Sequence, residues 1–440
     1  MTRKITLDYG LRYDYSTYER EQYGRMPDFS PTTPNPAFGS LLGAPIFEGY
    51  GPDRCNCHFA HDYPYALGPR LGLAYQVLPK TVLRAGFGIV YDSTANTSFA
   101  AATVATETLV VPSGSTGFDE PVITLAKGVQ VTPTWPNFSP GQFPSLTNLN
   151  LVDPNAGRPA RQMQWSVGLQ REIFTNLLVE AAYVANVGVW WPSTNLVNYN
   201  VLTPQRLAAD GLNLNNAADR TLLTSEIGST LAASRGFNNL PYPGFPLTET
   251  VAQSLLPFPQ YGTISPLWAP LGKTWYDSLQ TKATKRLSHG LSLTALFTWS
   301  KSLQMGTESG AINNVLNRPV NKYISGYDQP FVFATQVSYL VRGLPKSGGN
   351  KLANGGAWIT RDWTLGTVLQ YASGLPILAP TSTNSLSSVL FQSTFANRVP
   401  GVPLFTVNLN CHCYDPTTTF VLNPAAWTQP PPGTFGTAAA

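Results

Sequence analysis

The stretch Ile5-Thr-Leu-Asp-Tyr-Gly-Leu-Arg-Tyr-Asp-Tyr15 carries an apolar or aromatic side chain at every second position. Threonine, aspartate, glycine and arginine occupy the positions between them. Successive side chains of a β-strand point to opposite sides, so this alternation predicts a strand with one apolar and one polar face. Its length is close to the roughly 9–11 residues with which a tilted strand crosses a bilayer.

The same alternation recurs along the chain and predicts about nine strands in all. Besides residues 5–15, it occupies residues 70–77, 83–92, 162–170, 177–186, 276–287, 291–300, 331–341 and 363–371. The segment 276–287 fits less well than the others because Lys285 falls on its apolar side.

Shorter and longer connections alternate between these strands. The shorter ones are residues 78–80, 174–176, 288–290 and a glycine-rich stretch at 343–356, and the longer ones are 16–66, 93–160, 192–274 and 304–328. An up-and-down membrane barrel with periplasmic turns and long external loops produces this order. We expect the long loops to be ordered by turns rather than by cores, with short helices in residues 203–233.

The composition agrees with a membrane barrel and excludes other classes. Charged residues make up only 12% of the chain, about half the usual share, yet the mean hydropathy is −0.08. No apolar run approaches the roughly 18 residues that a spanning helix requires. Aromatic residues, at 12%, are abundant enough for girdles at the lipid–water boundaries. A net charge of +4 without basic runs argues against a nucleic-acid partner.

The sequence thus predicts an all-β fold: an antiparallel up-and-down transmembrane β-barrel with long extracellular loops, present in part as about nine or ten strands. The alternative is a soluble β-protein whose apolar face points to a core. The polar face, a mixture of glycine, glutamine, serine, threonine, arginine and aspartate, favours a wide, wet lumen. The residues predicted to face the lumen are Asp8, Arg12, Arg70, Arg84, Gln164 and Glu180. Those predicted to face lipid are Leu7, Tyr9, Leu83, Phe87, Trp165, Leu293, Phe297, Phe333 and Leu365.

Two Cys-X-Cys clusters are the only candidates for metal chemistry. They comprise Cys55, Cys57 and His58 in one predicted external loop, and Cys411, His412 and Cys413 in another. Cysteine and histidine are good ligands for soft metals. The spacing is not that of a zinc knuckle, however, and four cysteines suit disulfides in an oxidising compartment. We favour disulfides and expect no cofactor; the pairing is left open.

Catalytic residues are not apparent. A hydrolase triad in a barrel wall needs a histidine on a strand near the rim. Of the four histidines, His289 lies in a tight turn and the others lie near cysteines. We therefore expect no enzyme activity. In the loops, Trp135, Phe245 and Trp268 are candidates for contact with a solute.

Several stretches carry a family resemblance. Residues 5–13 resemble a strand of TonB-dependent outer-membrane receptors, and residues 68–75 with 80–88 resemble the hairpin that follows it. Residues 276–280 running to 285–291, residues 298–303 and residues 423–427 are similar to the Oar-like branch, which is associated with an N-terminal carboxypeptidase-regulatory-like domain. Each motif is weak alone, but they occur in order along most of the chain.

The resemblance implies a barrel of about 22 strands, an internal plug, and a segment before the plug that contacts TonB. No export signal precedes the first strand. We therefore expect residues 1–440 to be one partial outer-membrane β-barrel domain of a longer protein, without signal peptide, plug or C-terminal closing strands.

The expected function is that of the barrel region of a TonB-dependent transporter in the outer membrane of a Gram-negative-type bacterium. It would take up a bulky solute, whether saccharide, siderophore or peptide. The implied partners are outer-membrane lipid, the TonB complex and this unknown solute, around a monomeric barrel. The alternatives are a passive porin, a surface adhesin, or a secreted carbohydrate-binding β-protein.

Overall fold

The computed structural model describes most of the chain. The described residues are 4–92, 146–307, 314–341, 358–384 and 394–438, except 21, 23, 25, 194, 195, 361, 412 and 416, together with 386 and 389. Within these residues, none of the helices has the length and apolar character needed to cross a membrane.

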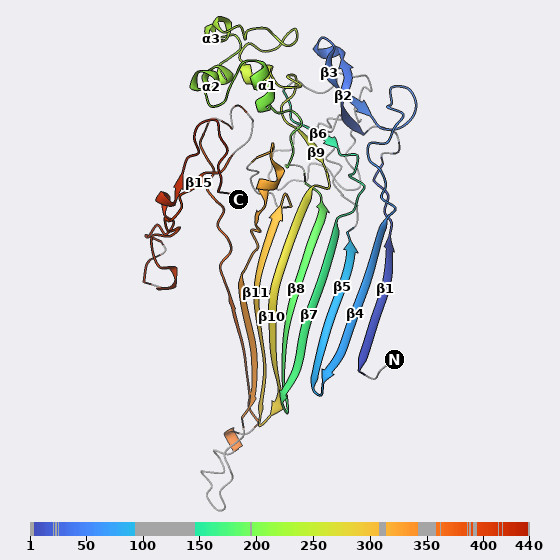
Figure 1. Cartoon of the computed structure of the whole chain (residues 1–440), viewed down its shortest axis with the longest axis vertical. Coiled ribbons are helices and arrows are strands. Elements are labelled where there is room, and N and C mark those ends of the chain that lie inside the picture. Colours follow the sequence, from blue (N-terminus) through green and yellow to red (C-terminus); the bar gives the residue numbers. More distant parts are fainter. Residues whose placement is uncertain are drawn as a thin grey trace, which may run out of the picture.

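One large antiparallel sheet contains all nine predicted strands (Figure 1). Its members, in order across the sheet, are β1 (Ile5–Asp14), β4 (Ala66–Leu78), β5 (Thr81–Tyr91), β7 (Arg161–Phe174), β8 (Leu177–Trp191), β10 (Gly272–Ser288), β11 (Leu291–Met305), β13 (Phe331–Leu340) and β14 (Thr364–Ala372). The short β12 (Tyr323–Ile324) pairs with the end of β11. Spatial order follows chain order, which confirms the predicted up-and-down topology.

Tight turns close one end of the sheet. They comprise Pro79-Lys80, Thr175-Asn176 and His289-Gly290, and in each the last or both residues have positive φ. Hairpin turns that match the right-handed twist of the strands require this conformation, which asparagine and glycine adopt at low cost. The fourth predicted turn, residues 343–356, lies outside the described residues.

The pairing register places most apolar side chains of the strands on one face and most polar ones on the other. A row of directly opposed residues on one face reads Leu7, Leu73, Ala85, Val167, Tyr183, Leu279, Trp299 and Phe331. The adjacent row on the other face reads Asp8, Gly72, Gly86, Ser166, Val184, Ser278 and Ser300. Because the side-chain period of a strand is two, a slip by one residue in any strand would have mixed these rows.

No other part of the described chain covers the apolar face of the sheet. Leu7 is 64% exposed and Tyr9 78%, and most large apolar residues of β14 are exposed as well. A contiguous exposed apolar surface of this size is unusual for a protein surrounded by water. The sheet therefore needs an apolar medium beside it.

The long loops gather at the other end of the sheet and form a folded cap (Figure 1). Its elements are β2 (Pro27–Asn35), β3 (Leu41–Phe47), β6 (Leu149–Val152), β9 (Ile264–Leu267), α1 (Pro204–Ala209), α2 (Ala217–Thr224), α3 (Thr230–Ser234) and α4 (Val251–Ser254). The C-terminal segment adds β15 (Asn397–Arg398) and β16 (Trp427–Thr428). Single 3₁₀ turns occupy Pro36–Phe38, Arg318–Asn321, Leu409–Cys411 and Pro424–Ala426.

The cap has hydrophobic cores of its own, so the expectation of loops ordered by turns alone was wrong. The largest core joins the helices and includes Leu202, Leu222 and Leu256, which are almost wholly buried. A second core, around Tyr261, and a third, around Phe59, join loops that leave different strands. Most of the buried apolar residues lie in the cap and not in the sheet.

Three short helices of the cap, α1, α2 and α3, lie in or next to the predicted range 203–233, whereas α4 was not predicted. Thr203 caps α1 by accepting a hydrogen bond from the Arg206 amide, and Pro204 takes the first helical position. Asn216, Ser229 and Thr250 cap α2, α3 and α4 in the same way. Helices of four to eight residues are marginal in isolation, so packing into the core stabilises them.

Candidate functional site

The polar face of the sheet is the first candidate surface. The register places the six predicted lumen residues on this face: Asp8, Arg12, Arg70, Arg84, Gln164 and Glu180. They occupy neighbouring strands from β1 to β8 and form a continuous polar wall. That this wall borders a water-filled interior stays a prediction.

Hydrogen bonds connect part of the polar wall across three strands. Arg84 Nε on β5 donates to Gln170 Oε1 on β7 at 3.2 Å, and Gln170 Nε2 donates to Glu180 Oε1 on β8, also at 3.2 Å. Lys282 on β10 stands opposite Glu180 in the register. The glutamine thus links a cation to an anion through its amide, and sequence alternation gave no sign of this contact.

A hollow opens on the polar wall, between β4, β5 and β7. Its volume is about 420 Å³, and Arg70, Gln164 and Ser166 line it. Gly86 and Gly88 form part of its floor because neither has a side chain. A Cβ at Gly86 would lie 3.3 Å from the Ser166 hydroxyl, so a larger residue there would begin to fill the hollow.

The opposite face carries the nine residues predicted to meet lipid: Leu7, Tyr9, Leu83, Phe87, Trp165, Leu293, Phe297, Phe333 and Leu365. It also carries polar residues that the prediction did not include. Asp277 and Lys301 oppose each other on β10 and β11, and the Tyr183 hydroxyl donates to Asp277. Lys285 lies near the turn, where its amine reaches Ser288, so its long side chain can leave an apolar layer.

The cap is the second candidate surface, and Tyr261 joins two of its loops. Asn35 Nδ2 donates to the Tyr261 hydroxyl at 3.0 Å and to the Gly43 carbonyl at 3.1 Å. Asn200 and Gln253 donate from their side-chain amides to the Tyr261 carbonyl. The loop between β1 and β4 is therefore bound to the loop between β8 and β10 by fully buried polar contacts.

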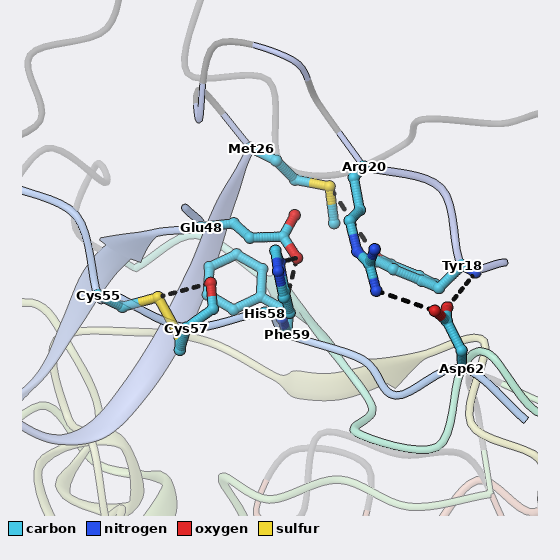
Figure 2. A network of polar contacts seen from close by, with 9 residues as sticks. All are labelled: Tyr18, Arg20, Met26, Glu48, Cys55, Cys57, His58, Phe59 and Asp62. Carbon is cyan, nitrogen blue, oxygen red and sulfur yellow. Dashed lines mark hydrogen bonds and ion pairs between the residues drawn. A yellow bond between two sulfur atoms is a disulfide. The ribbon is translucent and has the colours of Figure 1, made fainter. Parts of the chain in front are cut away.

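A polar network lies within the loop between β1 and β4 (Figure 2). Glu48 Oε1 accepts a hydrogen bond from the Phe59 amide at 3.0 Å and lies 3.4 Å from His58 Nδ1. Asp62 accepts from the Tyr18 amide at 2.8 Å and from the Arg20 guanidinium at 3.1 Å. Burial and the nearby carboxylate of Glu48 raise the pKa of the Tyr18 hydroxyl, which therefore stays protonated.

Asp28 is an acidic group of the cap whose pKa is raised strongly by burial. Burial raises its pKa to about 7, although hydrogen bonds from the amides of Phe29 (2.7 Å) and Val152 (2.9 Å) act in the opposite direction. The carboxylate of Glu48 raises the pKa further. Asp28 is thus a group whose charge changes near neutral pH inside the cap.

We expect Asp28→Asn to reduce the pH dependence of cap stability. Since the folded-state pKa lies above the ordinary carboxyl value, the folded cap binds this proton more tightly than the unfolded chain does. The stabilisation is fully present at acidic pH and is lost as the pH rises through about 7. Between about pH 5 and 7.5 the native cap should lose about 2 kcal/mol. Hydrogen exchange at the Phe29 and Val152 amides measures the loss; equal pH slopes in both proteins would contradict the assignment.

The four cysteines form disulfides within each cluster, Cys55 with Cys57 and Cys411 with Cys413. This agrees with the favoured interpretation and adds the pairing that the sequence left open. Backbone hydrogen bonds from Cys55 to Phe47 and from Gly49 to Cys57 fix the first pair beside β3. Over the part of the chain that the structure describes, no three acidic, histidine or cysteine side chains are grouped to hold a metal ion. His412 lies outside that part.

Peptide mapping without reduction should find Cys55 and Cys57 in one peptide that is lighter by two hydrogens, and likewise Cys411 and Cys413. Because each bridge closes a very short loop, its removal should cost at most about 2 kcal/mol. Thermal unfolding of the reduced and alkylated protein measures this cost. A peptide that joins the first cluster to the second would overturn the pairing.

The loop aromatics that were candidates for solute contact differ in their exposure. Phe245 is buried in the core around Tyr261, so it is not available to a solute, and that expectation was wrong. Trp268 is half-buried and contacts the Tyr18 ring edge to face. Trp135 lies outside the described residues. Nothing in the local sequence marks Phe245 as buried, because its neighbours in the core come from other loops.

The family model described as "Outer membrane beta barrel domain" matches residues 1–440. No curated protein matches the chain. Among solved structures, the chain is similar to the alcaligin outer-membrane receptor FauA from Bordetella pertussis at 11% identity, covering 85% of this chain and 35% of that one with a TM-score of 0.31.

Two further structures are similar at the same level. The ferric-catecholate import receptor Fiu from Escherichia coli K12 is 10% identical, with 77% of this chain and 30% of that one covered and a TM-score of 0.30. The outer-membrane transporter YddB from Escherichia coli is 9% identical, with 83% and 38% covered and a TM-score of 0.31. The chain therefore spans about a third of the length of these proteins.

Proposed function

The chain belongs to the outer membrane beta barrel domain family, and from this premise we propose that it forms part of the barrel of a TonB-dependent transporter for a bulky solute. Its location is the outer membrane, where the bilayer supplies the apolar medium that the exposed face of the sheet needs. The strands supply a wall and the cap supplies an external surface on which a solute can be held.

The polar wall is the observation that carries the proposal. A barrel that encloses a folded plug needs an inner face with hydrogen-bonding groups across many strands, and such wide barrels are plugged in outer-membrane transporters. The Arg84–Gln170–Glu180 contacts and the glycine-floored hollow beside Arg70 provide donors, acceptors and space on that face. The partner for these groups is proposed to be the plug of the complete protein, on which TonB acts.

The branch and the solute are finer proposals. The ordered motifs at residues 276–291, 298–303 and 423–427 support an Oar-like receptor with a carboxypeptidase-regulatory-like domain. A saccharide, a siderophore or a peptide would each suit a cap that presents both aromatic and polar side chains. We propose that the barrel is monomeric, requires no cofactor and has no catalytic role.

Reconstitution of the complete protein into liposomes tests the proposal against a passive porin. A plugged transporter should give no swelling in maltose or stachyose, and the periplasmic domain of TonB should bind it. Rapid swelling with either sugar would identify an open pore. If TonB fails to bind and no swelling occurs, a surface adhesin replaces the transporter.

A further inference from the structure

The outward face of the sheet ends, beside the cap, in a row that contains two cations. Tyr91, Arg161, Val189, Lys273 and Met305 stand opposite one another on β5, β7, β8, β10 and β11. They share the face of Phe87, Trp165 and Phe297. The rim of the apolar surface is therefore basic on β7 and β10.

Aromatic rings hold Arg161 and the neighbouring Arg158 in place. The guanidinium carbon of Arg161 lies 4.1 Å from the centre of the Trp190 ring, and that of Arg158 lies 4.4 Å from the same ring. Arg158 also lies 5.2 Å from the ring centre of Tyr63. Since both lie over one indole, the two guanidinium carbons are at most 8.5 Å apart, the sum of 4.1 and 4.4 Å. Two like charges within that distance favour an anion beside them.

An irregularity in β8 brings Trp190 to this position. Val189 pairs with Lys273 and Trp191 with Gly272, so Trp190 has no opposite residue and forms a bulge. Its φ of 66° lies in the left-handed region, which is unfavourable for a bulky residue. The stacking of both arginines on its ring offsets part of that cost. Bulges of this kind redirect a side chain at the end of a strand.

Strand β7 shows where the basic rim lies relative to the bilayer. On the outward face of β7, Arg161 and Arg171 enclose only Met163, Trp165, Val167 and Leu169. Ten positions separate the two arginines, which matches the roughly 9–11 residues that a tilted strand needs to cross the hydrocarbon layer. Arg171 adjoins the turn, so Arg161 lies in the head-group layer on the side of the cap.

The positive charge of this rim is not neutralised within the described chain. None of Arg158, Arg161 and Lys273 has a carboxylate within ion-pair distance among the described residues. Lys322, which directly precedes β12, is exposed at the same end of the sheet. It lies 4.0 Å from the centre of the Trp275 ring on β10 and adds a further cation. Four cations thus line one stretch of head-group layer, and among the residues that the structure describes none of the four has an acid within ion-pair distance.

We propose that Arg158, Arg161 and Lys273, supported by Trp190, bind the phosphate of a lipid in the outer leaflet. Guanidinium groups bind phosphate through two parallel hydrogen bonds, which a neutral sugar cannot replace. The occupant is a phosphate-bearing lipid, because such a lipid presents its phosphate at the height of Arg161 while its chains cover Met163 and Trp165. The lipid fixes the depth and orientation of the barrel in the membrane.

Equilibrium binding to the complete protein in detergent micelles tests the site, with bisphosphorylated lipid A as the probe. Each cation near a charged lipid surface contributes a factor of about 5, so R158Q/R161Q should weaken binding about 25-fold. Lipid A from which both phosphates have been removed should bind the native protein about as weakly. R158K/R161K keeps both positive charges but loses the paired hydrogen bonds, so it should weaken binding by less than R158Q/R161Q does.

The control is K80Q/K285Q, which removes the same charge at the turn end of the sheet, with Lys285 on the same outward face. It should leave the affinity within about twofold of the native value. Native affinity in R158Q/R161Q, with circular dichroism showing an intact sheet, would overturn the proposal. Equal binding of phosphorylated and dephosphorylated lipid would also overturn it. Full competition by free inorganic phosphate would show a small-anion site in place of a lipid site.

Discussion

Phe297→Arg should destabilise the protein in a bilayer by about 4 kcal/mol, whereas Thr298→Arg, the next residue along β11, should cost less than about 1 kcal/mol. Phe297 lies near the middle of β11 on the outward face, opposite Phe333 and stacked on Phe331 at 6.3 Å between ring centres. An arginine there must enter hydrocarbon near the midplane. Thr298 points to the polar wall, where an added arginine stays hydrated.

Equilibrium unfolding of the complete protein in lipid vesicles, with guanidinium chloride as denaturant, measures both free energies. The comparison is matched because the two variants place the same side chain one residue apart on the same strand. Similar costs at both positions, or a larger cost at Thr298, would show that the outward face does not meet lipid. The assignment of all nine outward residues would then fail with it.

Tyr261→Ala should destabilise the cap by about 4 kcal/mol without loosening the sheet. The Tyr261 side chain is fully buried, contacts Phe29 and Phe38 edge to face, and accepts a hydrogen bond from Asn35. Its removal leaves a cavity between the two loops and takes away one of the two acceptors of the Asn35 amide, whose bond to the Gly43 carbonyl remains. The loop from β1 to β4 should separate from the loop between β8 and β10.

Limited proteolysis of the protein in its membrane measures this separation. Hydrogen exchange of the strand amides shows whether the sheet stays intact. Leu247→Ala is the control because Leu247, in the same loop, is exposed and should change the cleavage rate little. Cleavage of Tyr261→Ala at the native rate would show that the two loops are held together elsewhere. Loss of protection in the strands would show that cap and sheet unfold as one unit.

These two expectations rest on different physics. The sheet exposes its apolar side chains and is stabilised by the bilayer and by the hydrogen bonds of its own ladder. The cap is surrounded by water and is stabilised by hydrophobic cores and buried amide contacts, as in a soluble domain. A condition that thins or removes the lipid should therefore affect the sheet before the cap.

The wall was predictable because its pattern is local. Alternation with a period of two identifies each strand and assigns its faces from a few neighbouring residues, and turn residues such as His289-Gly290 mark where the chain reverses. The segment with Lys285 on its apolar side was the weakest prediction. It is nevertheless the long strand β10, because a lysine next to the turn can reach the interface.

The sequence by itself therefore determined the nine long strands of the sheet, their order and the side of the sheet on which their residues lie, but not β12 or the short strands of the cap. Only the tertiary structure decided how the loops fold, which cysteines pair, and that Arg158 and Arg161 meet on Trp190. Asn35 and Tyr261 are separated by 226 residues along the chain, and no periodic signal connects them. Contacts of that kind depend on which loops the sheet brings together, and a one-dimensional pattern carries no record of it.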